Sequence, residues 1–119
     1  MDSINRAVFA NYPVNHYGEI WEKLVPLSFT RKTVLPRDIL CFLEQGTVRK
    51  LFVDTEKELP VDISVDFFFE GDIFTAKADN EIERQFTYQP ISKGILWYVD
   101  MREVRRLFLE FQISWIVER

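Results

Sequence analysis

The chain contains few side chains that could carry covalent or metal chemistry. It has one cysteine, Cys41, and one histidine, His16. A single cysteine cannot form an internal disulfide or a cysteine-ligated zinc site, and a single histidine cannot form a multi-histidine metal centre. Cys41 lies in the apolar run from Ile39 to Leu43, which predicts a buried, inert thiol. We therefore expect no metal site and no disulfide framework.

Catalytic pairs are also scarce. His16 has no serine or cysteine beside it in the sequence, so no nucleophile–base pair is indicated. Asp62 and Asp66 stand four residues apart on one face of a predicted strand. They could act as an acid and a base only if a cleft buried them, and a solvent-facing charged edge is the simpler interpretation. A small barrel enzyme would need a polar cavity with clustered carboxylates, and we predict no catalytic residues.

Composition and charge argue against further classes of protein. The 119 residues, 15% of them aromatic with eleven Phe, suit one folded domain rather than a disordered chain. A net charge of −4 argues against a stand-alone nucleic-acid binder, which needs a basic face. No run approaches the ~20 apolar residues of a membrane span, and the first residues do not form a signal peptide. We therefore expect a soluble, cytoplasmic protein that has no membrane partner.

Helical periodicity occurs at the two ends of the chain. Near the start, apolar residues at helical spacing predict a helix that Pro26 closes; they are Tyr17, Ile20, Trp21 and Leu24. Near the end, Asp100 is the predicted N-cap of a helix whose apolar residues are spaced 3, 4 and 3; they are Met101, Val104, Phe108 and Phe111. We expect N-terminal helices over about 1–26 and a C-terminal helix over 100–119.

Between these helices, residues 27–99 have the two-residue period and turn signals of about seven or eight short strands. The predicted first strand covers 27–34 and is followed by a turn at 36–38. In the clearest strand, 61–69, apolar residues at odd positions predict one buried face. The order of helix, strands and helix predicts a mainly β fold with flanking helices, such as a sandwich, barrel or jelly roll.

Three motifs together resemble the sensor domain of the Crp/Fnr family of bacterial transcription regulators. They cover 42–49, where Gly46 separates an apolar strand from a Val-Arg strand, 67–74, which contains Gly71-Asp72, and 95–100 with the helix that follows. The resemblance runs from about Tyr17 to Phe111. It implies a double-stranded β-helix, or jelly-roll barrel, of the cyclic-nucleotide-binding-domain type. Gly46 and Gly71 are expected at tight turns with positive φ.

Family members bind a small effector inside the barrel, dimerise through the helix that follows it, and read DNA with a helix-turn-helix beyond that helix. The resemblance therefore implies a set of effector-pocket candidates: Gly71, Asp72, Phe74, Thr75, Arg84, Gln85 and Thr87. It also implies a homodimer through the C-terminal helix, with these interface candidates: Phe108, Phe111, Trp115 and Ile116.

The chain departs from the family at the residues that hold a cyclic nucleotide. The family's Gly-Glu pair falls on Thr75-Ala76, which offers no carboxylate to the ribose, and Arg84 lacks the small hydroxyl residue that follows the family arginine. We therefore expect no ordinary cyclic AMP binding and no cofactor, with any effector unidentified. If Phe68 points into the barrel, it could narrow the pocket. A hairpin that the family carries between Lys32 and Phe42 is largely lost.

No residues follow Arg119 to form a helix-turn-helix, so DNA could be a partner only through a domain absent from this chain. We expect the chain to be a sensor fragment of a longer regulator. The alternative hypothesis is a ligand-free dimerisation or protein-interaction module with a β-barrel core.

Overall fold

The computed structural model describes residues 3–9, 18–54, 61–78 and 80–107 of the chain. Within these ranges, strands make up most of the structure and short helices lie at its ends. In chain order the elements are η1 (Arg6–Phe9), α1 (Ile20–Lys23), β1 (Val25–Phe29), β2 (Ile39–Gln45), β3 (Val48–Asp54), β4 (Val61–Phe68), β5 (Ile73–Ala76), α2 (Glu81–Arg84), β6 (Phe86–Pro90) and β7 (Gly94–Asp100), followed by helical residues 101–107.

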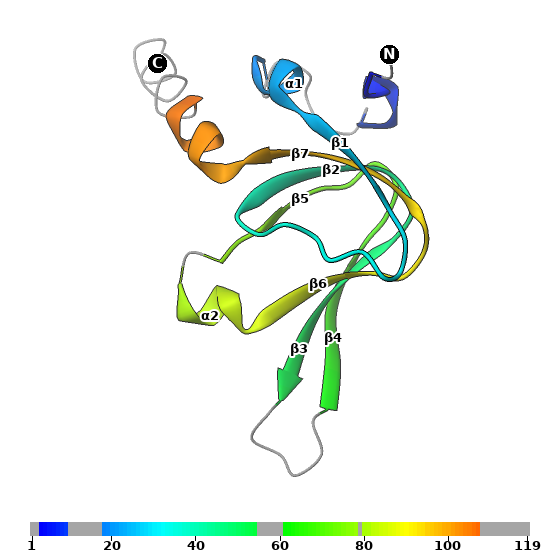
Figure 1. Ribbon diagram of the computed structural model, residues 1–119, viewed down its shortest axis with the longest axis vertical. Coiled ribbons are helices and arrows are strands. Elements are labelled where there is room, and N and C mark those ends of the chain that lie inside the picture. The colour runs from blue at the N-terminus through cyan, green and yellow to red at the C-terminus, as the bar shows by residue number, and fades with distance from the viewer. Residues whose placement is uncertain (1–2, 10–17, 55–60, 79, 108–119) are drawn as a thin grey trace.

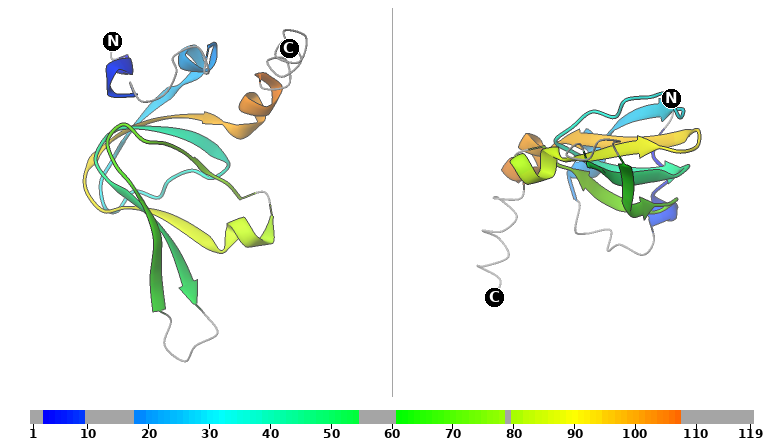
Figure 2. Two further views of the ribbon diagram at one scale, coloured as in Figure 1. Left: turned by 180° about the vertical axis from the view of Figure 1, so that it is seen from behind. Right: turned by 90° about the horizontal axis from the view of Figure 1, so that it is seen from below.

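The strands form two antiparallel sheets. The larger has the order β1-β7-β2-β5 and the smaller the order β4-β3-β6. In Figure 1 the two sheets face each other, and η1, α1 and residues 101–107 lie on the outer side of the larger one. Figure 2 shows the same layers from behind and from below. The fold is mainly β with flanking helices, as predicted, whereas a single domain over all 119 residues stays a prediction.

Strands β2 and β7 are buried on both faces, because each face meets a different layer. Cys41 and Leu43 of β2 belong to a cluster between the two sheets, here called the barrel interior, together with Leu35 and Leu96. The alternate residue Phe42 belongs to a second cluster, which packs the outer face of the larger sheet against the helices. Burial on two faces explains why these strands are continuous apolar runs without alternation.

The first strand begins and ends earlier than the sequence predicts. Trp21 and Leu24 are buried as the helical spacing indicates, but β1 already begins at Val25 and so includes Pro26. Proline is tolerated there because β1 is an edge strand of its sheet. The predicted strand over 27–34 is too long: β1 ends at Phe29, and a turn follows in which the Thr33 amide donates to the Thr30 carbonyl at 3.1 Å.

The predicted burial of the odd-numbered face of β4 is wrong. Ile63, Val65 and Phe67 are 43%, 49% and 43% exposed. β4 pairs with β3 at the edge of the smaller sheet, and these two strands extend beyond the larger sheet, so none of the described elements covers this face (Figure 1). The side chain of Phe68 packs against the barrel interior instead.

Turns and close approaches explain three glycines. Gly46 and Gly71 have φ of 98° and 93°, which confirms the expectation of positive φ at both turns. Gly94 is required for a different reason. A Cβ there would overlap the Gln45 carbonyl oxygen, because β7 begins directly against the end of β2.

The helix after β7 begins as predicted. An Asp100 carboxylate oxygen accepts the Arg102 amide at 2.8 Å, which confirms its capping role, and Met101 is buried. Val104 packs against the outer cluster. In the described part of the chain, no helix has the length and apolar character needed to cross a membrane.

Candidate functional site

Three stacked aromatic rings occupy the barrel interior beside α2. The ring centroids of Phe68 and Phe74 lie 4.1 Å apart, with an interplanar angle of 9°. The Tyr88 ring stacks with both, at 6.3 Å from Phe68 and 6.0 Å from Phe74. They come from β4, β5 and β6, so the stack bridges the two sheets. Aromatic side chains therefore fill this part of the barrel interior.

Two cations lie over the Tyr88 ring. The Arg37 guanidinium carbon is 5.5 Å from its centroid, and the Lys50 ammonium is 5.7 Å from it and 4.4 Å from the centroid of Phe86. Distances of this size permit cation–π attraction. Burial raises the pKa of the Tyr88 hydroxyl, and the charge and hydrogen bond of Lys50 oppose that shift. The aromatic stack is thus flanked by positive charge.

Arg37 holds the chain between β5 and β6 in place. Its guanidinium donates to three backbone carbonyls, those of Lys77 at 2.6 Å, Glu83 at 3.1 Å and Phe86 at 3.0 Å. The Arg37 Nε atom is buried and has no hydrogen-bond partner. Sequence reasoning missed Arg37, since only its place in a Pro-Arg-Asp turn was visible and its acceptors lie 40 to 49 residues away.

Asp38, the next residue, forms further backbone and side-chain hydrogen bonds to distant parts of the chain. It has a positive φ of 56°, which is uncommon for a residue other than glycine. Its carboxylate accepts the Ala78 amide at 2.7 Å, and its own amide donates to the Ala76 carbonyl at 2.6 Å. Its carbonyl accepts the Met101 amide at 2.8 Å. Arg37 and Asp38 therefore contact the end of β5, α2, the start of β6 and the first residue of the helix after β7.

The predicted pocket residues do not all lie together. Gly71 and Asp72 form the turn before β5, at the end of β5 away from α2, and an Asp72 carboxylate oxygen accepts the Phe69 amide at 2.7 Å. Phe74 points into the barrel interior. Thr75 pairs with Leu40, whose side chain belongs to the outer cluster, and thus faces away from Phe74.

The other three candidates lie beside α2 and are exposed. Arg84 is the last residue of α2, and Gln85 is its C-cap, with an amide that donates to the Ile82 carbonyl at 3.2 Å. Thr87 lies between Phe86 and Tyr88 on β6 and is exposed, opposite in direction to the buried Tyr88. The effector-binding roles of all seven candidates stay predictions. Four interface candidates lie outside the described residues: Phe108, Phe111, Trp115 and Ile116.

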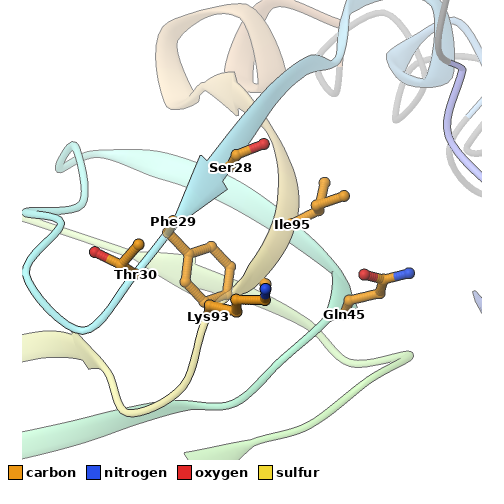
Figure 3. Close-up of a pocket in the computed structure, with 7 residues that line it drawn as sticks. Ser28, Phe29, Thr30, Gln45, Lys93 and Ile95 are labelled. Atoms are coloured by element: carbon orange, nitrogen blue, oxygen red, sulfur yellow. The ribbon is translucent and has the colours of Figure 1, made fainter.

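A shallow surface cavity of about 390 Å³ lies at the opposite end of the barrel from α2 (Figure 3). It is formed where β1 and β2 end and β7 begins. Its lining residues are Ser28, Phe29, Thr30, Gln45, Lys93, Gly94 and Ile95. None of them is an effector-pocket candidate, so this cavity is separate from the region around α2.

The remaining residues that were considered for catalysis or metal binding do not form a site in the described part of the chain. Cys41 is a buried free thiol, as predicted, and burial raises its pKa far above the ordinary value. Asp66 is exposed and accepts the Phe67 amide at 2.8 Å, whereas the side chain of Asp62 and all of His16 lie outside the described residues. Within the described part of the chain, no three His, Cys, Asp or Glu side chains group as metal ligands.

Comparison of the sequence with models of known protein families found no match, and comparison with curated proteins found none either. Solved structures do match. The heme domain of CooA from Carboxydothermus hydrogenoformans is 17% identical with a TM-score of 0.58, over 83% of this chain and 71% of that one. The Thermus thermophilus catabolite activator protein is 12% identical with a TM-score of 0.59, over 94% of this chain and 56% of that one.

A putative cAMP-binding regulatory protein from Silicibacter pomeroyi is 15% identical with a TM-score of 0.61, over 85% of this chain and 52% of that one. The chain thus spans about half the length of these last two proteins. At such identities the likeness establishes the fold, and it agrees with the resemblance carried by the motifs around Gly46 and Gly71. The chain has the jelly-roll fold that Crp/Fnr-type sensor domains share with cyclic-nucleotide-binding domains.

Proposed function

We propose that this chain is the effector-sensing regulatory domain of a cytoplasmic, Crp/Fnr-like transcription regulator, with no catalytic activity. The observation that carries the proposal is the jelly-roll fold shared with sensor domains, completed by a helix that begins directly after β7. An effector would act by shifting the population of pre-existing arrangements of that helix. DNA would be bound by a domain that follows the helix.

The reading frame beyond the codon for Arg119 tests the regulator proposal. We expect it to encode the rest of a dimer helix and then a helix-turn-helix. A stop codon directly after Arg119 would contradict a DNA-reading role for this protein.

We further propose that the domain does not bind cyclic AMP in the way usual for the fold. Ala76 stands at the position of the ribose-binding glutamate and is buried against β2, so it supplies no acceptor. The stacked rings of Phe68, Phe74 and Tyr88 fill the adjoining interior. Any effector would therefore need a different shape and different contacts.

Isothermal titration calorimetry of the full chain with cyclic AMP tests this second proposal. We expect no saturable heat at ligand concentrations up to the millimolar range. Binding of one cyclic AMP per chain with a micromolar or lower Kd would overturn it. The same titration is repeated on the Phe74→Leu variant, which opens the aromatic stack. This variant distinguishes two causes of failed cyclic AMP binding, exclusion of the ligand by the rings and absence of the ribose-binding glutamate.

The proposed homodimer forms through the C-terminal helix. We expect sedimentation equilibrium to give a dimer that Phe111→Ser shifts towards monomer. Lys32→Ser is the matched control, because Lys32 is an exposed residue of the turn after β1. A wild-type chain that stays monomeric at high concentration would contradict this proposal.

The alternative is a ligand-free dimerisation or protein-interaction module, and the aromatic stack in the barrel interior favours it. A thermal-shift screen with small metabolites distinguishes the two functions. Ligand binding to the folded state raises the Tm, by an amount that grows with ligand concentration over Kd. A stable dimer whose Tm no metabolite changes would favour the ligand-free module.

A further inference from the structure

We propose that the surface cavity at the end of the barrel away from α2 binds a small organic acid. The anionic group of this ligand contacts Lys93, and its apolar part covers Ile95. The cavity has a volume of about 390 Å³. Ligand pockets commonly have volumes of about 300–1,000 Å³. The proposal does not rest on the sensing function, because none of the effector-pocket candidates lines this cavity.

Three neighbouring strands place the cavity's side chains in one row. Ser28 of β1 pairs with Ile95 of β7, and Ile95 pairs with Gln45 of β2. Directly opposed residues of antiparallel strands share one face of a sheet, so these three side chains lie side by side across the larger sheet. Ser28 and Gln45 are exposed and Ile95 is partly buried. The row therefore has an apolar surface between a hydroxyl and an amide (Figure 3).

Two glycines bring Lys93 to this row. A Cβ at Gly46 would lie 3.0 Å from the Lys93 carbonyl oxygen, and a Cβ at Gly94 would overlap the carbonyl oxygen of Gln45. The end of β2 and the residues that begin β7 are thus in close backbone contact, which holds Lys93 beside Gln45. In the described part of the chain, the side chains of Ser28, Gln45 and Lys93 form no hydrogen bond or ion pair with other residues. Their donors can therefore bind a ligand.

The charge of the segments that build this cavity is opposite to that of the whole protein. The chain has a net charge of −4, yet the segments 23–37 and 84–99, which supply β1 and β7, contain no Asp or Glu. The Nε atom of Arg31 donates to the Ile91 carbonyl at 3.1 Å, which holds the turn after β1 beside the loop before β7. The two segments contain six basic residues, which are Lys23, Arg31, Lys32, Arg37, Arg84 and Lys93. A concentration of one sign of charge attracts ligands of the opposite sign.

These features determine the chemical class of the ligand. An ammonium group beside hydroxyl and amide donors binds a carboxylate through charge-assisted hydrogen bonds. No acidic side chain lines the cavity, so an amine would find no counter-charge. The side chain of Ile95 offers apolar contact to a short hydrocarbon chain. Because the cavity is shallow and open to water, dissolved salt should screen the attraction between Lys93 and the carboxylate.

NMR titration of the full chain tests this site. Sodium butyrate is the probe, since it joins a carboxylate to a short alkyl chain; butanamide and n-butylamine keep the chain without the negative charge. We expect butyrate to shift the amide resonances of Ser28, Gln45 and Ile95 saturably, with a Kd of about 10 mM or lower for so small a ligand. The two uncharged or cationic compounds should leave these resonances almost unchanged. Addition of about 0.5 M NaCl should weaken butyrate binding about threefold or more.

Substitutions test the residues of the site. Lys93→Gln should raise the Kd for butyrate about fivefold or more, because it removes the charge. Lys23→Gln is the matched control, since Lys23 is an exposed lysine at the end of α1, away from the cavity, and its Kd should equal that of the wild type. Ser28→Trp should abolish binding, because the larger side chain occupies the cavity without changing the charge. Ser28 and Lys93 are both exposed, so we expect both variants to fold.

Three results would overturn the proposal. The first is an equal Kd for butyrate in Lys93→Gln and Lys23→Gln. The second is a set of butyrate-induced shifts centred on α2 and Tyr88 in place of the cavity. The third is an equal Kd for inorganic phosphate at the same amides, which would mean that the apolar part of the ligand contributes nothing. A stop codon after Arg119 would contradict the regulator proposal but would not change any of these outcomes.

Discussion

Charged side chains at the residue scale stabilise the start of the helix after β7. Asp100 accepts hydrogen bonds from both the backbone amide and the guanidinium of Arg102, and one carboxylate oxygen lies 3.1 Å from an Arg102 nitrogen. These bonds lower the pKa of Asp100. One turn later, Arg106 pairs with Glu103 at 2.8 Å and lowers the pKa of that carboxyl. The ionised form of Asp100 is therefore the stronger cap.

The pH dependence of stability tests this cap. Because the pKa of Asp100 is lower in the folded chain, its stabilisation is complete above the unfolded value of about 3.9 and is lost as the pH falls through the folded value. We expect wild type to exceed Asp100→Asn in free energy of unfolding at pH 7, and the difference to shrink below about pH 4. Asparagine still caps a helix, so the difference reports the charge.

Urea denaturation at pH 7 and pH 3 gives this measurement. Glu70→Gln is the control, since Glu70 is an exposed carboxylate in the turn after β4, away from the helix. A difference between wild type and Asp100→Asn that is the same at both pH values would show that the charge of Asp100 does not contribute.

At the scale of elements, position in the sheet decides how much a phenylalanine contributes. Phe42 lies on β2, inside the larger sheet, and its ring contacts Phe9 and Trp21 at centroid distances of 5.5 and 4.9 Å. Phe67 lies on the edge strand β4 and stacks on Phe69 at 6.4 Å, where both rings are largely exposed. Both residues are phenylalanines, but of these two side chains only that of Phe42 is surrounded by other elements.

Alanine substitutions should separate these two positions. We expect Phe42→Ala to lower the free energy of unfolding by about 3–5 kcal/mol, because it leaves a cavity between the sheet and the helices. Phe67→Ala should lower it by about 1 kcal/mol or less, because its side chain already contacts water. Chemical denaturation of dilute protein measures both changes, and equal losses would contradict the layering described for β4.

At the scale of the whole molecule, β2 and β7 belong to two cores at once. Cys41 faces the barrel interior, and its neighbour Phe42 faces the outer cluster, which also contains Trp21 and Trp97. A strand cannot leave one core and remain in the other, so the two clusters should lose their packing together.

Two probes of unfolding test this coupling of the cores. Cys41 is the chain's single cysteine, so the reactivity of its thiol in urea reports the barrel interior. In a Trp115→Phe background, the remaining fluorescence comes from Trp21 and Trp97 and reports the outer cluster. We expect the two probes to give the same urea midpoint. Thiol exposure at clearly lower urea than the fluorescence change would show that the barrel opens independently.

Local sequence patterns determined much of this protein. The apolar run of β2, the glycines at positive φ, the Asp100 cap and the buried Cys41 were all predictable, because each depends on neighbouring residues and on backbone conformation. Their order indicated a sandwich, barrel or jelly roll, and the resemblance of three motifs to the Crp/Fnr family selected the jelly roll. The resemblance named Phe74 as a pocket candidate, and its side chain does lie in the barrel interior. Neither the patterns nor the resemblance identified Arg37, which donates to carbonyls before, within and after α2.

Tertiary structure alone decided the rest. Alternation along β4 shows that the strand has two faces, but only the tertiary arrangement, in which β3 and β4 extend beyond the larger sheet, leaves its apolar face exposed (Figure 1). Likewise, Arg37 gained its role from carbonyls 40 or more residues away, which the fold brings to it. Periodicity and turn chemistry are local properties of the chain, whereas burial at an edge and long-range hydrogen bonds depend on which elements meet in space.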